Sequence, residues 1–137
     1  MTQEETEILL VEDNVEDAEQ ITRALKEHYP TINVVHVKDG DEALEFIFCQ
    51  NRFQFRDILN QPKLVLLDLM MPKVSGIHVL EKIKSDYRSN TIPVIILTSS
   101  KEDPNIEQCF NLGANSYIVK PTDYIGFLKA FEDLDIY

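Results

Sequence analysis

The sequence predicts an α/β fold, a doubly wound five-stranded parallel sheet with helices on both of its faces. Three observations support this prediction. Short apolar runs alternate five times with segments whose apolar residues recur at helical spacing. The run that begins at Leu64 is apolar throughout, as in a strand buried on both faces of a parallel sheet. The chain has 137 residues, which fits a single domain over residues 1–137. The expected strand order is 2-1-3-4-5.

Each expected strand is a short run of apolar or β-branched residues that stops at polar ones. The third run stops at Asp68. The strand must have ended by Pro72, because proline cannot donate a hydrogen bond to a neighbouring strand. The last run stops at Lys120 and Pro121. The expected strands are residues 8–11, 32–37, 64–68, 92–97 and 117–119.

Helix starts are marked by side chains that accept hydrogen bonds from the first helical turn. Glu42 follows Asp39 by three residues, which is the spacing of a capping box. Pro104 follows Asp103 as a first-turn proline, and Gly113 suits the left-handed position that ends a helix. The expected N-caps are Asn14, Asp39, Ser75, Asp103 and Asp123.

The formal net charge of −11 argues against two classes of partner. Nucleic acid and anionic membrane surfaces attract clustered Lys and Arg, so we expect neither as a ligand. No apolar run approaches membrane-spanning length, and the acidic start of the chain is unlike a signal peptide, so we expect a cytoplasmic location. Cys49 and Cys109 both fall in apolar helical contexts and are expected to be buried, reduced thiols.

Polar side chains follow four of the five expected strands. Glu12 and Asp13 follow the first strand, Asp68 ends the third, Thr98 follows the fourth and Lys120 follows the fifth. An aspartate at a strand end is by itself more often a turn former or a helix cap. Parallel strands, however, deliver their carboxyl ends to one edge of the sheet, where such folds bind ligands. We therefore expect these side chains to share one cleft.

This set of side chains suits phosphoryl transfer to a carboxylate. Clustered carboxylates repel one another unless a cation lies among them, and hard oxygen ligands at a partly hydrated site suit Mg²⁺. Asp68 could act as the nucleophile and form an aspartyl phosphate. Lys120 would pair with the phosphoryl group, and the Thr98 hydroxyl could donate to one of its oxygens. A glycine-rich phosphate loop is missing from the sequence, so no nucleotide is implied.

Four motifs carry a family resemblance: residues 8–14 (ILLVEDN), residues 67–72 (LDLMMP), the pair Thr98-Ser99 and residues 119–121 (VKP). In these motifs, and over essentially its whole length, the chain resembles the response regulator receiver domains of two-component signalling. The resemblance implies that Asp68 accepts a phosphoryl group from a histidine kinase. It also implies that Glu12, Asp13 and Asp68, together with the backbone carbonyl of Met70, organise Mg²⁺, and that Thr98 and Lys120 bind the phosphoryl group.

The resemblance also implies a switch. Phosphorylation draws Thr98 towards the phosphate, and Tyr117 packs into the space that is vacated. As a result, the face made by the fourth helix, fifth strand and fifth helix changes shape. The added charge of the phosphoryl group thus shifts the equilibrium between two packing arrangements of this face. In the alternative interpretation Tyr117 is a half-buried strand aromatic with no switching role, since strands favour aromatic residues.

The Gln50–Gln61 segment shows no clear period and is expected to be a long loop with room for one helical turn. With this insertion and no output domain after the fifth helix, the chain resembles the stand-alone regulators of phytochrome-type histidine kinases. Such relatives often form homodimers through the last two helices and last strand. Alternatively the aromatic residues near the end of the chain pack on their own sheet, as periodicity favours for Phe131. The candidate contact residues are Tyr124, Phe127, Phe131 and Tyr137.

Three other classes compete with this interpretation. A metal-dependent phosphatase with an aspartyl nucleophile usually has a second acid two residues later, but that position is Met70, which cannot transfer a proton. A pure interaction module would more plausibly lack Asp13, Asp68 or Lys120. A flavodoxin could share the fold, but its phosphate-binding loop has no counterpart here. We therefore expect a phosphoacceptor that catalyses its own phosphorylation and dephosphorylation and is not a turnover enzyme.

Overall fold

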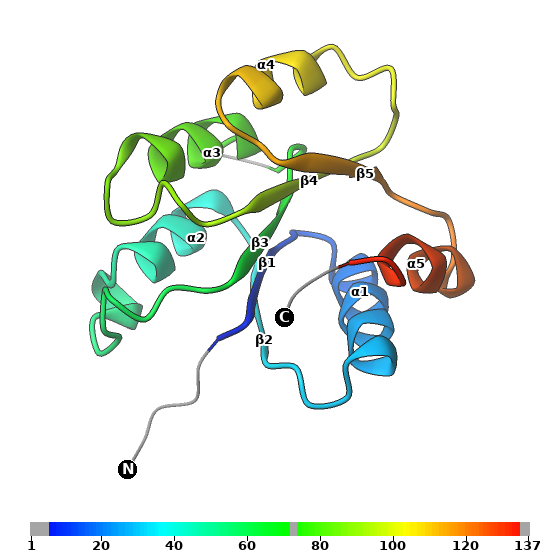
Figure 1. Cartoon of the computed structure of the whole chain (residues 1–137), viewed down its shortest axis with the longest axis horizontal. Helices are drawn as coiled ribbons and strands as arrows, with labels where there is room; N and C mark the ends of the chain where they lie inside the picture. The colour runs from blue at the N-terminus through cyan, green and yellow to red at the C-terminus, as the bar shows by residue number, and fades with distance from the viewer. Residues whose placement is uncertain (1–5, 72–73, 135–137) are drawn as a thin grey trace.

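The computed structural model describes residues 6–71 and 74–134. Its sheet contains five parallel strands in the order β2-β1-β3-β4-β5, which confirms the predicted fold class and strand order (Figure 1). β3 ends at Asp68, before Pro72, which lies outside the described residues. The strands are β1 (Ile8–Val11), β2 (Val34–Val37), β3 (Leu64–Asp68), β4 (Val94–Thr98) and β5 (Ser116–Val119).

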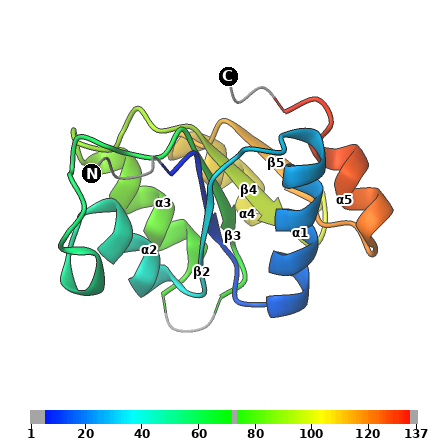
Figure 2. The same ribbon diagram turned by 90° about the horizontal axis from the view of Figure 1, so that it is seen from below.

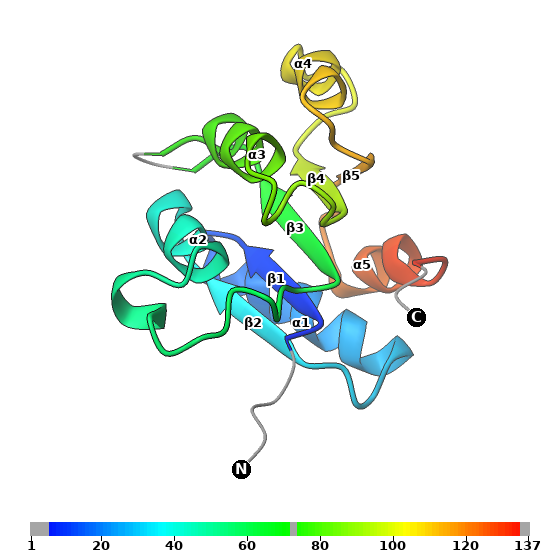
Figure 3. The same cartoon turned by 60° about the vertical axis from the view of Figure 1, so that its left-hand side comes forward.

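Helices cover both faces of the sheet. α2, α3 and α4 lie on one face, and α1 and α5 lie side by side on the other (Figures 2 and 3). This arrangement follows from right-handed crossovers between parallel strands on either side of the reversal point at β1 and β3. The helices are α1 (Val15–His28), α2 (Gly40–Ile47), α3 (Gly76–Ser85), α4 (Asn105–Asn111) and α5 (Tyr124–Phe131), with a short 3₁₀ helix, η1 (Asn51–Phe53).

Two apolar layers hold the helices to the sheet. Successive residues of β1 point to opposite faces, so Leu9 packs beneath α2 and α3, whereas Leu10 packs beneath α1 and α5. Every residue of β1, β3 and β4 is buried, as predicted for central strands covered on both faces. The edge strand β5 is mostly exposed. The central strands therefore form a rigid base whose carboxyl ends carry Glu12, Asp68 and Thr98.

Most predicted helix starts are confirmed. The side chains of Asn14, Asp39, Ser75 and Asp123 each accept a backbone hydrogen bond from the third residue after them. α4 begins one residue later than predicted, at Asn105, and Asp103 accepts from the backbone N–H of that residue at 2.9 Å.

Other boundaries and pairings also differ from the prediction, and β5 begins one residue earlier than expected, at Ser116. Glu42 accepts from Lys38 N rather than from the N-cap residue, so the capping box is displaced by one position. β2 and β4 each begin two residues later than expected, since the N–H groups of Ile32 and Ile92 donate to the turn carbonyls of Tyr29 and Ser89. Gly113 adopts a φ of 108°, as predicted for the residue that ends α4.

The predicted loop at residues 50–61 contains η1 and is fastened by an arginine. Arg56 donates to the carbonyl of Asn60 at 2.6 Å, also donates to the carbonyl of Phe46, and lies over the Phe46 ring. The expected burial of Cys49 is wrong, because this residue follows α2 with a φ of 54° and is only half-buried, whereas Cys109 is buried as expected. Within the described residues, no helix is long and apolar enough to cross a membrane.

Candidate functional site

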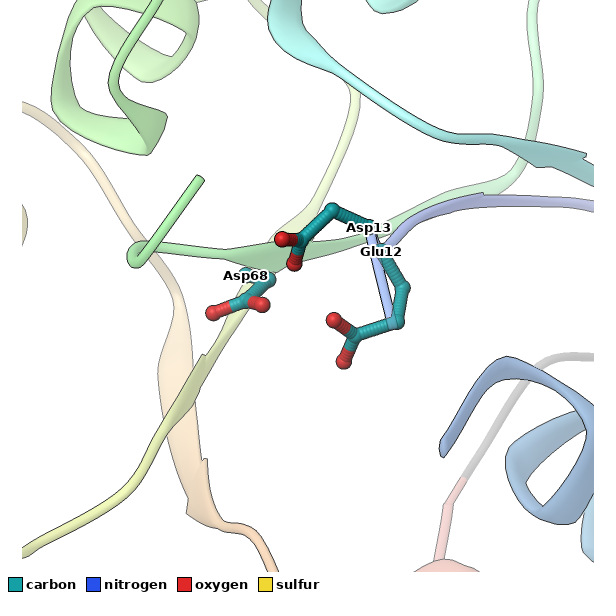
Figure 4. A group of neighbouring side chains, drawn as sticks. All are labelled: Glu12, Asp13 and Asp68. Carbon is teal, nitrogen blue, oxygen red and sulfur yellow. The ribbon is translucent and has the colours of Figure 1, made fainter. Parts of the chain in front are cut away.

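Three carboxylates converge where β1 and β3 end. Glu12 and Asp13 follow β1 directly, and Asp68 is the last residue of β3, the neighbouring strand. Each contributes an oxygen, and the three oxygens lie within 4.8 Å of one another (Figure 4). Glu12 is fully buried and Asp68 is 2% exposed, whereas Asp13 faces solvent. The sequence prediction that these acids meet at one sheet edge is therefore confirmed.

Lys120 reaches into this carboxylate cluster from the end of β5. Its backbone N–H donates to the carbonyl of Thr98 at 2.7 Å, which anchors the residue to β4. Its ammonium Nζ lies 2.6 Å from Glu12 Oε1 and 3.1 Å from Asp68 Oδ2. A third carboxylate, Asp17 Oδ2, lies 3.4 Å from the same atom. One cation is thus shared among three acids from three different elements.

Burial and charge shift the pKa values of this group in opposite senses. Desolvation, strengthened by the neighbouring Asp68, raises the pKa of Glu12 to about 8, although Lys120 acts to lower it. Burial by itself lowers the pKa of Lys120, but the contact with Glu12 and the charge of Asp68 outweigh burial and raise that pKa. Lys120 therefore stays protonated at neutral pH, and burial favours the protonated form of Glu12.

The carboxylate cluster fits a divalent cation. Glu12 Oε2 accepts from the Asn14 N–H at 3.3 Å. Glu12 Oε1 is fully shielded from solvent and lies 2.6 Å from the Lys120 ammonium, without an aligned hydrogen bond among the described residues. Buried carboxylates are costly unless cations compensate them, and Lys120 supplies one cation against the three clustered acids. The donors here are hard carboxylate oxygens on a partly open edge, which suits Mg²⁺ or Mn²⁺ rather than a softer metal.

Asp68 is held by its own loop and by a close helix. Its Oδ1 accepts from the backbone N–H of Met70 at 2.9 Å, and the Met70 side chain is exposed. α3 begins against this turn at Gly76, where an added Cβ would lie 2.5 Å from the Asp68 carbonyl oxygen. Only glycine allows this approach. The role predicted for the Met70 carbonyl as a metal ligand stays a prediction.

The Thr98 hydroxyl makes no hydrogen bond to Asp68 in this structure. Its Oγ1 donates towards Asp103 Oδ2 at 3.1 Å and towards the Ser100 carbonyl at 3.2 Å. Tyr117, on β5, is 37% exposed and packs edge-on against Phe110 of α4, with ring centroids 6.1 Å apart. The threonine is therefore held by the loop that leads to α4, and the aromatic ring faces outwards.

The structure adds two acids that sequence reasoning left out of the site. Asp17 suits the positive end of α1 by sequence, yet its carboxylate contacts Lys120, which is 103 residues away in the chain. Asp103, expected only as a cap, also accepts from Thr98. The position of Asp17 in the sequence could have indicated its role, because Asp17 lies one helical turn beyond Asp13 on a helix that begins beside the site.

The suggested contact role of the aromatic residues near the end of the chain is corrected in part. Phe127 and Phe131 are buried and stack on each other against the sheet, so they are not available to a second molecule. Tyr124 is half-buried beneath the Arg23 guanidinium, which lies 4.0 Å from its ring centroid. Tyr137 lies outside the described residues. Periodicity placed Phe131 correctly, and Phe127 lies one helical turn before it.

The fold is a doubly wound α/β domain, and its site is a cluster of acidic side chains that could hold a cation at the carboxyl edge of the sheet. The model of the response regulator receiver domain family matches residues 8–132, and the chain belongs to that family. It is thus a receiver domain of two-component signalling, as the resemblance indicated.

Several curated relatives match most of the chain, and two of them illustrate the similarity. The protein named "Probable methanogenesis regulatory protein FilR2", from Methanothrix harundinacea, is 35% identical over 95% of this chain and 81% of its own length. The response regulator Rcp1 of Synechocystis is 30% identical over 93% of this chain and 85% of its own length.

Solved structures of response regulators are also similar, and two of them are structures of phytochrome response regulators. The bacteriophytochrome response regulator RtBRR has a TM-score of 0.83 and 37% identity, covering 98% of this chain and 80% of that one. The phosphorylated cyanobacterial phytochrome response regulator RcpA has a TM-score of 0.84 and 33% identity, with coverages of 94% and 90%. The Mn²⁺-bound form of Rcp1 has a TM-score of 0.82 and 30% identity, with coverages of 93% and 89%.

Proposed function

We propose that this receiver domain accepts a phosphoryl group on Asp68 from a sensor histidine kinase, with Mg²⁺ as cofactor. One observation carries the proposal: a buried strand-end aspartate lies within reach of two further acids and a lysine ammonium. The phosphorylated form of RcpA and the Mn²⁺-bound form of Rcp1 support it, because both proteins resemble this chain over most of its length.

The chemistry follows from the placement of the side chains. A carboxylate oxygen of Asp68 would attack the phosphorus of a phosphohistidine, a P–O bond would form, and the P–N bond would break as the imidazole leaves and regains its proton from solvent. Lys120 contacts Asp68 Oδ2 and would pair with a transferred phosphoryl oxygen. The Thr98 hydroxyl would leave Asp103 and donate to another phosphoryl oxygen. Water would later attack the phosphorus, which returns Asp68 to a carboxylate and releases inorganic phosphate.

The cation would be held by Glu12, Asp13 and Asp68, with the Met70 carbonyl as a fourth protein ligand. When bound, it would neutralise the charge that develops on the phosphoryl oxygens. The chain's own contribution is to fix the acids on two neighbouring strand ends and to keep Asp68 away from bulk water. The domain would thereby promote its own phosphorylation and dephosphorylation without acting as a turnover enzyme.

The signal would leave through the face formed by α4, β5 and α5. Movement of Thr98 would break its hydrogen bond to Asp103 Oδ2. The other oxygen of Asp103 accepts from the N–H of Asn105, the first residue of α4, so the movement would be felt at the start of that helix. Tyr117 would then turn inwards from its present exposed position. This exposed face also bears Phe110, Val119 and Ile125, which a downstream protein or a second copy of the chain would cover. A phytochrome-type kinase is the proposed upstream partner, given the relatives of known structure.

The experiment that tests the proposal is intact-mass measurement after incubation with acetyl phosphate, with Mg²⁺ and with EDTA. We expect a gain of one phosphoryl group that requires Mg²⁺, is labile to hydroxylamine and is lost in Asp68→Asn. Asp41→Asn, an exposed aspartate in the first turn of α2, is the matched control and should be phosphorylated normally.

Transfer from a phosphorylated histidine kinase provides the second arm. If neither acetyl phosphate nor the kinase labels the folded parent protein, the chain is a constitutive interaction module and the proposal is wrong. Labelling that persists in Asp68→Asn would assign the acceptor to another residue and would also contradict it.

A further inference from the structure

The Lys120 ammonium faces two kinds of carboxylate. Glu12 and Asp68, at 2.6 and 3.1 Å, belong to the carboxylate cluster that could hold a metal ion. Asp17, at 3.4 Å, does not belong to that cluster. It projects from the first turn of α1, where the Asn14 side chain fixes its backbone N–H at 2.9 Å. Asp17 is therefore a partner that Lys120 can keep when the other two acids are engaged elsewhere.

A divalent cation in the carboxylate cluster would conflict with Lys120 as it now lies. Glu12 Oε1 and Asp68 Oδ2 are the oxygens nearest to the ammonium, and a cation bound to Glu12 and Asp68 would bring like charges into close contact. Lys120 is only 17% exposed, so its side chain has little freedom to escape into solvent. Some acid outside the cluster must hold the ammonium if the cation and the lysine are to coexist.

We propose that Asp17 is a positioning residue that holds Lys120 beside the site while Glu12 and Asp68 bind the cation. The inference rests on the proposed function, because it assumes that the carboxylate cluster binds Mg²⁺. The inference gives α1 a role in the site, because the residues at the strand ends do not include an acid that is free to hold Lys120 while the cation is bound. Without Asp17, Lys120 would depend wholly on Glu12 and Asp68 and would compete with the metal for them.

The test is the dissociation constant of Mn²⁺, measured on the unphosphorylated protein by electron paramagnetic resonance of free Mn²⁺. We expect Asp17→Asn to weaken binding about tenfold, the lower end of what outer partners of metal ligands contribute. Glu16→Gln removes the same charge from the neighbouring, exposed residue of α1 and should change the constant less than twofold. Asp17→Glu, which keeps the carboxylate, should restore most of the affinity.

A double-mutant cycle shows whether Asp17 acts through Lys120. In a Lys120→Met background, Asp17→Asn should have no greater effect than Glu16→Gln, because there is no ammonium left to hold. A tenfold loss that persists in that background would overturn the inference, as would equal Mn²⁺ affinity of Asp17→Asn and the parent. If the parent itself binds no Mn²⁺, the metal site of the proposed function fails first, which is a distinct result.

Discussion

Replacing Lys120 by methionine removes the cation from the centre of the site while keeping a side chain of similar length. The Lys120 ammonium lies 2.6 Å from Glu12 and 3.1 Å from Asp68, whose side chains are 0% and 3% exposed. Removing one partner of a buried ion pair leaves an uncompensated charge and costs about 3–5 kcal/mol. Glu12, with a pKa of about 8, is already largely protonated at pH 7, so the charge left uncompensated is mainly that of Asp68 and the loss is limited. We therefore expect a destabilisation of about 3 kcal/mol, at the lower end of that range.

Urea unfolding followed by far-ultraviolet circular dichroism measures this loss. In EDTA at pH 7, Lys120→Met should unfold at lower urea with an unchanged m-value, and its melting temperature should fall by about 10 °C. Saturating Mg²⁺ should recover much of the loss, because a cation among the carboxylates replaces the missing positive charge. Lys129→Met, at an exposed position on α5, is the control and should stay within about 0.5 kcal/mol of the parent.

Two results would refute this reasoning. If Lys120→Met is as stable as the parent in EDTA, the ion pairs of Lys120 do not compensate the buried acids. If its destabilisation is the same in Mg²⁺ as in EDTA, the loss comes from packing of the side chain and not from its charge.

Three further predictions concern other parts of the molecule. Gly76→Ala places a Cβ 2.5 Å from the Asp68 carbonyl oxygen and 2.7 Å from Leu69 Cα, so calorimetry should show a loss of about 2 kcal/mol despite the helix preference of alanine. Phe131→Ala removes a fully buried ring and should cost about 3–5 kcal/mol in urea unfolding while leaving Mn²⁺ affinity unchanged. The raised pKa of Glu12 makes the native state bind a proton more tightly than the unfolded state, so this residue's contribution to stability in EDTA should fall as pH rises from about 4.5 to 8. Urea midpoints at several pH values should show this decline in the parent and lack it in Glu12→Gln.

The sequence by itself determined the element order, the strand order and the residues at each strand end. These features depend on local patterns: apolar runs for strands, helical spacing for helices, and caps such as Asn14 and Ser75. Parallel strands place their carboxyl ends on one edge, so Glu12, Asp13 and Asp68 had to meet once the topology was known.

Only the tertiary structure decided which partner each side chain chooses. Asp17 and Lys120 are 103 residues apart, and no local pattern joins them. Whether Thr98 bonds to Asp103 or faces Asp68 depends on the path of the loop after β4, which the pattern of apolar residues does not encode.

The direction of the aromatic rings was decided in the same way. Phe127 is turned inwards by packing against α1 and the sheet, whereas Tyr117 faces out from an edge strand, although both lie in stretches of similar apolar character. The raised pKa of Glu12 likewise arises from burial, which neighbours distant in the sequence create. A sequence pattern determines which face of a helix or strand a residue occupies. The burial and contacts of that residue depend on how the other elements pack around it in the folded domain.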